Sequence, residues 1–345
     1  MTQTKKKKLP TAYLVAAAVA VAGIVALCCY YLLGSLSTHD DVQYVYIDAD
    51  DNIDSVFAKL QPISCGAGMT ALRTVARHTS YSEHIHTGRY AVRPGEGALS
   101  VYQMLSRGEQ EPMRLTVPEA RTMPRMAALL AKKLMLDSAT IANALTDNGF
   151  CQKYGQDTAT MACLFIPNTY DIYWDVSIDG LMKRMKREHD NFWTAARRSK
   201  AEAAGLTPDE VQTLASIVDE ETANNEEKPK VAGMYLNRVR KHMLLQADPT
   251  VKFALKQFDL RRILNVHLKV ESPYNTYLHV GLPPGPIKVA SVKGIDAVLN
   301  HVPSDYLYMC AKEDFSGTHN FARTYSEHLA NARRYQQALN ARGIK

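Results

Sequence analysis

The sequence predicts an α+β protein with more than one folded part behind an N-terminal transmembrane helix. Three observations support this prediction. From Leu9 to His39 the chain carries no Asp, Glu, Lys or Arg, short strand and helix patterns follow within about 40–150, and amphipathic helices precede a Pro/Gly/Tyr-rich segment after residue 205. The chain has 345 residues, which exceeds the usual length of one domain.

The first forty residues predict a membrane anchor. Residues 12–36 are dominated by Ala, Val, Leu, Ile and Tyr, which is long enough for a bilayer-spanning helix, and we assign the helix to residues 11–34. The lysines at 5–8 favour a cytoplasmic tail at 1–10, so the sequence predicts a single-pass protein of the cytoplasmic (inner) membrane with its bulk outside the cytoplasm. A cleaved signal peptide is the alternative.

The charge distribution argues against a nucleic-acid partner. The formal net charge is +6, and four of the positive charges are the lysines at 5–8. The rest of the chain is therefore close to neutral and predicts no broad basic face.

Four cysteines follow the anchor, namely Cys65, Cys151, Cys163 and Cys310. An even number outside the cytoplasm permits disulfides without showing which cysteines pair. Cys151 with Cys163 is the first pair to test, and four buried thiols are the alternative.

Residues 40–150 predict small strand-and-helix modules. The first has a strand, a turn and a helix at Val42–Ile47, Asp48–Asp51 and Ser55–Leu60. The second repeats this layout loosely at Met113–Val117, Pro118–Thr122 and Pro124–Leu136. Between them, a strand runs into a Gly/Pro turn and a helix is expected at Ala98–Leu105, ending before Gly108. Such modules bind an extended ligand or hold the next domain away from the membrane.

A connector is predicted at 151–204. Pro167–Tyr170 reads as a rigid turn, and one long polar helix is expected from about Ile178 to Ala204. Its sparse apolar residues favour a solvated spacer.

The helix that follows has clear start signals. Thr207 can act as N-cap, Pro208 fits the first helical position and Glu210 completes a capping box. Apolar residues then recur at helical spacing, at Val211, Leu214, Ala215 and Val218. A second helix is expected around Lys230–Arg240.

Three consecutive carboxylates, Asp219, Glu220 and Glu221, lie at the end of this helix. At about 100° per residue, Glu220 points to solvent, Asp219 lies on a polar shoulder of the apolar stripe and Glu221 on an apolar shoulder. A carboxyl held against apolar side chains has a raised pKa and keeps a proton to donate near neutral pH. Glu221 is therefore the candidate acid, and a solvated acidic helix end is the alternative.

Further polar groups gather downstream. Pro249 is expected to push Asp248 out of helical geometry and expose it, close to Gln246. Tyr277 and its neighbours Tyr274 and Asn275 offer ring faces and hydrogen bonds of the kind that sugars use. Prolines stiffen the loop from Gly281 to Ile287, in which Gly281 and Gly285 allow close backbone approach to a ligand, and two histidines follow, at His319 and His328.

These motifs together resemble the endolytic murein transglycosylases of the YceG-like family. The matching segments occur in the family's order and spacing, at 214–222, 231–238, 245–251, 274–277, 281–287 and 319–328. The resemblance is strong over about 140 residues. It implies a membrane anchor, LysM-like modules at 40–150 and a mixed α+β catalytic domain at 205–345.

The resemblance also implies residue roles. The family's catalytic glutamate matches Glu221, and the cleft positions match Gln246, Asp248, Asn275 and His319. The implied reaction cleaves MurNAc-β-1,4-GlcNAc bonds within nascent peptidoglycan strands, leaves 1,6-anhydro-MurNAc ends and terminates elongation, with peptidoglycan synthases as partners. One carboxyl group would serve as acid and then as base, and no cofactor is needed.

Two other functions stay open. A muramidase would use water and a second carboxylate such as Asp248. A non-catalytic cell-wall-binding scaffold would not depend on Glu221. A metal enzyme is disfavoured because no His-Glu-x-x-His motif occurs, and His84-Ile-His86 reads as a polar strand or turn.

Overall fold

The computed structural model describes residues 11–343, so the predicted cytoplasmic tail at 1–10 lies outside the described residues. Helices are combined with three two-stranded sheets, which agrees with the predicted α+β class. The chain divides into two compact units, unit 1 at Met1–Met113 with Asp171–Asp175, and unit 2 at Arg114–Tyr170 with Val176–Lys345.

Unit 1 begins with the predicted anchor helix. Helix α1 spans Thr11–Leu33, and none of its residues is buried against the rest of the chain. It is long and apolar enough to cross a membrane.

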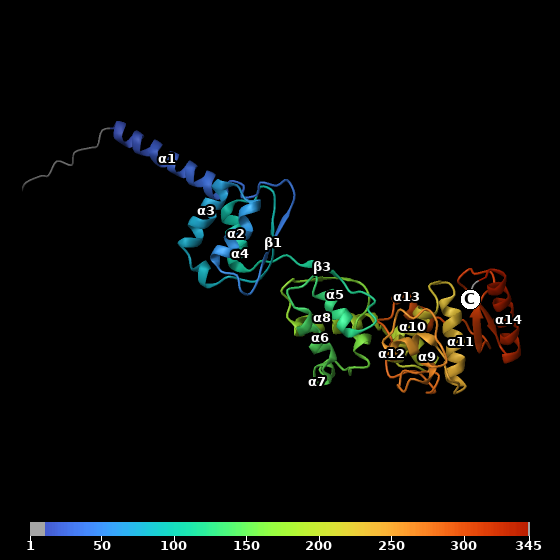
Figure 1. Ribbon diagram of the computed structural model, residues 1–345. Helices are drawn as coiled ribbons and strands as arrows, with labels where there is room; N and C mark the ends of the chain where they lie inside the picture. Colours follow the sequence, from blue (N-terminus) through green and yellow to red (C-terminus); the bar gives the residue numbers. More distant parts are fainter. Residues whose placement is uncertain (1–10, 344–345) are drawn as a thin grey trace, which may run out of the picture. The chain divides into compact units, whose positions relative to one another are not determined.

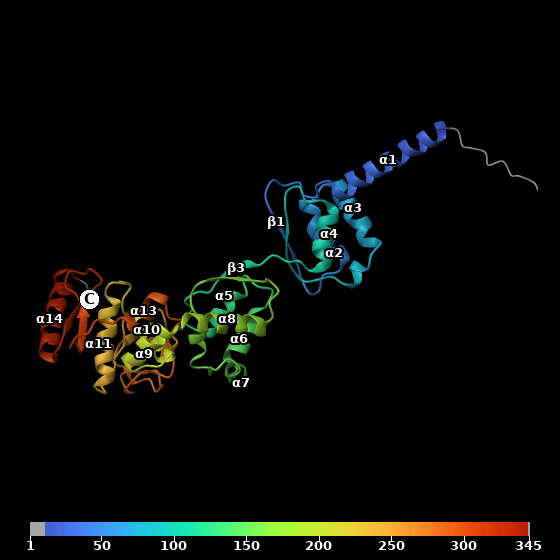
Figure 2. The same cartoon turned by 180° about the vertical axis from the view of Figure 1, so that it is seen from behind.

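The rest of unit 1 combines a strand pair with three helices. Strands β1 (Gln43–Ile47) and β2 (Gly88–Val92) pair antiparallel, with Gln43 opposite Val92. The helices are α2 (Ile53–Leu60), α3 (Gly66–Arg77) and α4 (Ala98–Arg107). Both views of the molecule show these helices packed together beside β1 (Figures 1 and 2).

Local sequence signals account for the helix ends in unit 1. Asn52 and Ser55 form a capping box at the start of α2. Gly108, with φ of 65°, ends α4 in the left-handed conformation, which confirms the predicted stop. Buried side chains from all five elements share one core, including Ile47, Phe57, Leu72, Tyr90 and Leu105.

A second strand-and-helix group follows, and most of its residues belong to unit 2. Strand β3 (Met113–Thr116) pairs with β4 (Thr169–Ile172). Between them lie α5 (Met123–Leu130), α6 (Ser138–Thr146) and α7 (Asn148–Gln152). The predicted helix at 124–136 is too long, because α5 ends at Leu130 and the Asp137 side chain caps a new helix by accepting from the backbone N–H of Thr140 at 2.8 Å.

The predicted long polar helix is two helices. Helix α8 (Ile178–Phe192) ends at Trp193, and Thr194 caps α9 (Ala195–Ala204) by accepting from the Arg197 N–H. The prediction of a solvated spacer is also wrong, because α8 buries an apolar face formed by Leu181, Met182 and Met185.

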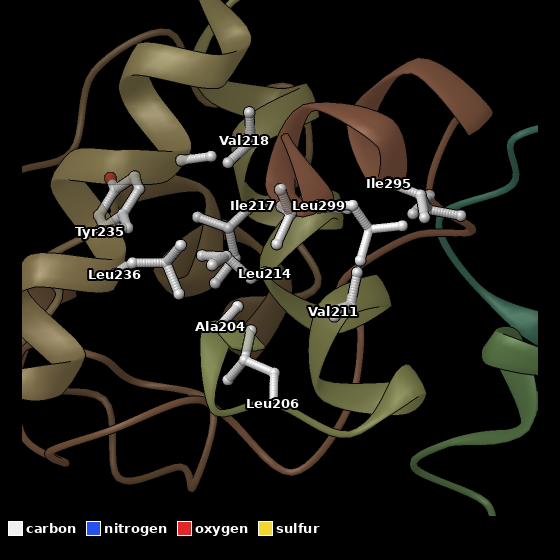
Figure 3. Packing of buried hydrophobic residues seen from close by; sticks show 14 of the residues in the cluster. Ala204, Leu206, Val211, Leu214, Ile217, Val218, Tyr235, Leu236, Ile295 and Leu299 are labelled. Atoms are coloured by element: carbon white, nitrogen blue, oxygen red, sulfur yellow. The ribbon is translucent and has the colours of Figure 1, made fainter. Parts of the chain in front are cut away.

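The core of unit 2 surrounds α10 (Pro208–Glu221), which has the predicted capping box of Thr207 and Glu210. Its neighbours are α11 (Lys228–Arg240), α12 (Asp248–Leu255) and α13 (Val292–Leu299). Apolar side chains of α10 pack between α11 and α13 (Figure 3), namely Val211, Leu214, Ile217 and Val218 against Tyr235, Leu236, Ile295 and Leu299. This packing fixes the helix that ends in the three carboxylates.

A hairpin and a helix complete the chain. Strands β5 (Tyr308–Ala311) and β6 (His319–Ala322) pair antiparallel, with Ala311 opposite His319. Helix α14 (Tyr325–Ala341) follows, and α11 lies between α14 and the group of α10 and α13 (Figure 2).

All six cysteines fall within the described part of the chain, and each is a free thiol. Cys151 and Cys163 are buried, as the buried-thiol alternative expects, whereas Cys65 and Cys310 are partly exposed. Burial raises the pKa of the Cys163 thiol well above its ordinary value.

Candidate active site

One pocket of unit 2 brings together five of the six predicted site residues. Its volume is about 370 Å³, and its wall includes Glu221, Gln246, Asp248, Tyr277 and His319. These side chains come from the end of α10, the turn into α12, the loop after α12 and strand β6. Residues separated by almost 100 positions in sequence thus meet around one cavity.

Glu221 has the environment expected of a proton donor. It is half-buried as the last residue of α10, and the Tyr235 hydroxyl donates a hydrogen bond of 2.7 Å to Glu221 Oε1. Burial raises the pKa of Glu221 to about 7; the charge of Asp248 adds to this, whereas the Tyr235 hydrogen bond opposes it. A carboxyl with this pKa is protonated in a large fraction of molecules near neutral pH.

Asp219 is a buried structural carboxylate. Its side chain is 2% exposed and accepts from Lys228 Nζ at 2.6 Å. Ser291, the N-cap of α13, donates to Asp219 from its backbone N–H at 2.7 Å and from its hydroxyl at 2.8 Å. Asp219 therefore joins α10, α11 and α13 and is not available to the pocket.

Glu220 does not point freely to solvent as predicted. Arg121 Nη2 lies 2.8 Å from its carboxylate, and Lys288 Nζ lies 3.7 Å away. The side chain is 19% exposed. The loop before α5 supplies Arg121 and covers this face of α10, which the helix periodicity alone does not show.

Asp248 and Tyr277 form a polar pair in the pocket wall. The Tyr277 hydroxyl donates to Asp248 Oδ1 at 2.6 Å. Burial, followed by the neighbouring Asp248, raises the pKa of Tyr277, so its hydroxyl remains a donor. Asp248 is exposed as predicted. The expectation that Pro249 pushes it out of helical geometry is wrong, because proline is tolerated in the first helical turn and Asp248 is the first residue of α12.

Gln246 is held in the pocket wall by a buried arginine. Arg238 is 7% exposed and donates to the carbonyls of Leu244 and Leu245, both at 3.0 Å, and to Gln246 Oε1 at 3.3 Å. Gln246 has φ of 52°, in the left-handed region that non-glycine residues rarely adopt. Its N–H donates to the Thr276 carbonyl at 3.0 Å, which stabilises this conformation.

His319 reaches the pocket from β6 and is bound by Glu227. Glu227 Oε1 accepts from the His319 backbone N–H at 2.7 Å, and Oε2 lies 2.9 Å from the ring Nδ1. Burial alone would raise the pKa of Glu227, but the hydrogen bonds from His319 and Thr222 hold it below its ordinary value. Glu227 is therefore an anion buried beside the site.

Asn275 lies outside the pocket wall. It is fully buried, its amide nitrogen donates to the carbonyls of Leu268 and Val270 at 2.9 Å, and its oxygen accepts from the Tyr277 N–H at 3.0 Å. The structure thus places it beneath the loop that carries Tyr277. Its contacts shape that loop.

The glycine prediction in the Pro-rich loop is corrected at Gly285. A Cβ there would lie 2.1 Å from the Ala159 carbonyl oxygen, so the close approach is to the chain's own backbone. Two residues later, the N–H of Ile287 donates to the Ser216 hydroxyl of α10 at 3.0 Å. This loop supports the helix that carries Glu221.

Comparison with known proteins identifies the family. The model of the YceG-like family matches residues 45–334, which is most of the chain. The chain belongs to the YceG-like family. An endolytic murein transglycosylase of Bacillus subtilis (strain 168) is 29% identical over 270 residues, which cover 73% of this chain and 74% of that protein.

Two further relatives agree with this assignment. An endolytic murein transglycosylase of Streptococcus pneumoniae (serotype 2, strain D39) is 25% identical, across 68% of this chain and 48% of its own length. The crystal structure of a yceG-like protein from Listeria monocytogenes matches with a TM-score of 0.55 and 25% identity, covering 85% of this chain and 99% of that one.

Sequence reasoning missed three residues of this YceG-like protein that contact the candidate site residues, namely Glu227, Tyr235 and Arg238. Tyr235 and Arg238 lie in the motif at 231–238, and their helical positions place both on the pocket side of α11. Glu227 had no such signal, because its partner His319 is 92 residues away. Within residues 11–343, no group of three or more His, Cys, Asp or Glu side chains could hold a metal ion.

Proposed function

We propose that this YceG-like protein is an endolytic murein transglycosylase. It cleaves the MurNAc-β-1,4-GlcNAc bond inside peptidoglycan strands without water and leaves a 1,6-anhydro-MurNAc end. The observation that carries the proposal is a single half-buried carboxyl, Glu221, with a pKa of about 7 in a polar pocket. The names of the relatives in Bacillus and Streptococcus support the substrate class.

The acid step follows from the site. Protonated Glu221 donates to the leaving glycosidic oxygen as the bond from C1 to that oxygen breaks, while the sugar's own C6 hydroxyl attacks C1 and gives up its proton to a base. Neither a carboxylate nucleophile nor a carboxylate that activates water is needed, because the nucleophile belongs to the substrate. Gln246 and Asp248 orient the sugar in the pocket, with the Tyr277 ring beside them.

A muramidase is the competing reaction because the Asp248 carboxylate lies in the same pocket wall as Glu221. A carboxylate on the opposite side of the sugar would activate water and yield reducing ends. The hydrogen bond from Tyr277 to Asp248 favours the transglycosylase, since it occupies one of the oxygens that would activate water.

The surroundings of the site complete the proposal. Helix α1 anchors the protein in the cytoplasmic membrane with the catalytic unit outside the cytoplasm, as the positive charges at 5–8 favour. The strand-and-helix group β1–α2–α3–β2 supports the LysM-like assignment within 40–150. The second group, β3–α5–α6, is closed by β4 at Thr169–Ile172, which lies beyond residue 150. Termination of nascent strands beside a peptidoglycan synthase stays a prediction of the family resemblance.

The test is digestion of purified peptidoglycan by the full chain in detergent micelles, with mass analysis of the released ends. We expect anhydro ends from the wild type and a loss of about 10²–10⁴-fold in Glu221→Gln, the usual contribution of a general acid. Glu226→Gln is the matched control, because Glu226 is an exposed glutamate five residues away.

Each result has a clear reading. If the released strands carry reducing ends, the protein is a muramidase and not a transglycosylase. If the wild-type protein cuts no glycan, the remaining interpretation is a non-catalytic cell-wall-binding scaffold. Activity that survives in Glu221→Gln would assign the acid to another carboxyl.

A further inference from the structure

Glu227 and His319 form a carboxylate–imidazole pair at the edge of the pocket. Both oxygens of Glu227 are occupied by hydrogen bonds: Oε1 accepts from the His319 backbone, while Oε2 contacts the ring Nδ1 and accepts from the Thr222 hydroxyl at 3.0 Å. Glu227 is only 8% exposed, and the His319 side chain is 16% exposed. The imidazole ring is therefore held in one orientation.

This pairing defines the tautomer of the ring. Ionised Glu227 can only accept hydrogen bonds, so Nδ1 of His319 carries the proton that is shared with it. In the neutral ring, Nε2 then presents a lone pair. Within the described chain Nε2 has no hydrogen-bond partner, and the ring lies in the wall of the pocket that contains Glu221.

The pair is connected to the catalytic helix. Thr222 is the C-cap residue of α10 and follows Glu221 directly, and its hydroxyl donates to the same Glu227 oxygen that holds the imidazole. Glu221 and His319 thus line one cavity from α10 and β6, and Glu227 links the two elements through its hydrogen bonds to Thr222 and His319. A shift of either element would be transmitted to the other through Glu227.

We propose that His319 is the catalytic base of the reaction and that Glu227 is its positioning residue. The inference rests on the proposed function. Nε2 takes the proton of the C6 hydroxyl as the O6 electron pair forms the bond to C1. The bond from C1 to the leaving oxygen breaks, its electron pair stays on that oxygen, and Glu221 supplies the proton. The imidazolium then returns its proton to Glu221 through solvent.

Two groups fit this step better than one. A single carboxyl must lose its proton before it can accept another, whereas an acid and a separate base act together in one transition state. The other candidates in the pocket are engaged differently. Asp248 accepts from Tyr277, and His328 is stacked on the Tyr308 ring with a centroid distance of 5.4 Å.

The decisive variant is His319→Asn in the full chain in detergent micelles. The asparagine amide can still donate to Glu227 as Nδ1 does, but no atom replaces Nε2. We expect kcat for anhydro-end formation to fall about 10²-fold and added imidazole to restore it at least about tenfold, since the free ring can fill the vacated space. His279→Asn, a change at an exposed histidine, should leave kcat unchanged.

Glu227→Gln tests the positioning role. Alone it should lower kcat about tenfold or more, and in the His319→Asn background it should cause no further loss, because its effect acts through His319. A purely structural role would give losses that add and that imidazole does not reverse.

The two proposals fail in different ways. If wild type forms anhydro ends and Glu221→Gln does not, but His319→Asn keeps the wild-type kcat, the base assignment is overturned and the proposed function stands. The same holds if the lost activity of His319→Asn does not respond to imidazole. If wild type forms no anhydro ends, the proposed function itself is overturned.

Discussion

Replacing Glu221 by glutamine should stabilise the protein at alkaline pH and leave its stability unchanged at acidic pH. The pKa of this carboxyl is about 7 in the folded protein and 4.5 as an ordinary glutamate. Between these values the folded state binds more protons than the unfolded state, so the free energy of unfolding falls as pH rises. The neutral glutamine lacks this penalty and can still accept from Tyr235 through its side-chain oxygen.

The size of the effect follows from the shift. At about 1.4 kcal/mol per pKa unit, the shift corresponds to about 3 kcal/mol at and above pH 8, with the loss spread over the interval between the two pKa values. Solvent in the pocket makes this an upper bound. For a folded unit of this size, the difference in Tm should reach roughly 5–10 °C.

The assay is thermal unfolding of the full chain in detergent micelles at pH 4.5 and pH 8. Glu221→Gln should raise the Tm of the unit 2 transition at pH 8 and leave it near the wild-type value at pH 4.5. Glu226→Gln should change neither value, because Glu226 is exposed. An equal difference at both pH values, or a lower Tm for Glu221→Gln at pH 8, would refute the raised pKa.

Three further predictions concern the neighbours of the acid, and a fourth concerns the buried thiol of Cys163. Tyr235→Phe removes the hydrogen bond that lowers the pKa of the acid, so the alkaline fall of activity should move to higher pH in the pH–rate profile; an unmoved limb contradicts this. Asp219→Asn should destabilise the fold by about 3–5 kcal/mol by leaving Lys228 buried without its partner. Glu220→Gln should lower the free energy of unfolding by less than about 1 kcal/mol in the same unfolding assay. Equal losses for Asp219→Asn and Glu220→Gln would contradict the assignment of Asp219 as a buried structural carboxylate and of Glu220 as a more exposed one. Cys163 should resist iodoacetamide in the native protein and react fully in denaturant without reductant, and a thiol that stays blocked there would indicate a disulfide.

Local sequence signals predicted the elements best where the chain carried its own stop and start residues. The capping box at Thr207 and the left-handed Gly108 both occur as expected. The prediction of one long polar helix failed because Thr194 acts as the N-cap of a second helix. The low overall hydrophobicity of the segment concealed the apolar face of α8. Propensity patterns also could not show that Gly285 approaches the chain's own backbone, since Ala159 is far away in sequence.

The candidate site was predictable to the extent that a motif pointed to it. Gln246, Asp248, Tyr277 and His319 all lie in the pocket wall with Glu221. Asn275 belongs to the same motif as Tyr277, but its short side chain makes its hydrogen bonds to backbone groups of its own loop and does not reach the pocket. A motif therefore records residues that build a site as well as those that line it.

The three carboxylates at the end of α10 differ because each is met by a different partner. Rotation by about 100° per residue separates them around the helix, but rotation alone does not set their charge. Asp219 meets Lys228 and the capped start of α13, and Glu220 meets Arg121 and Lys288. The hydrogen bond that Glu221 receives comes from a neutral hydroxyl, and a second carboxylate shares its pocket. Among residues 11–343, Glu221 therefore has no ion-pair partner, unlike Asp219 and Glu220, so burial raises its pKa and it is the carboxyl that can hold a proton for transfer.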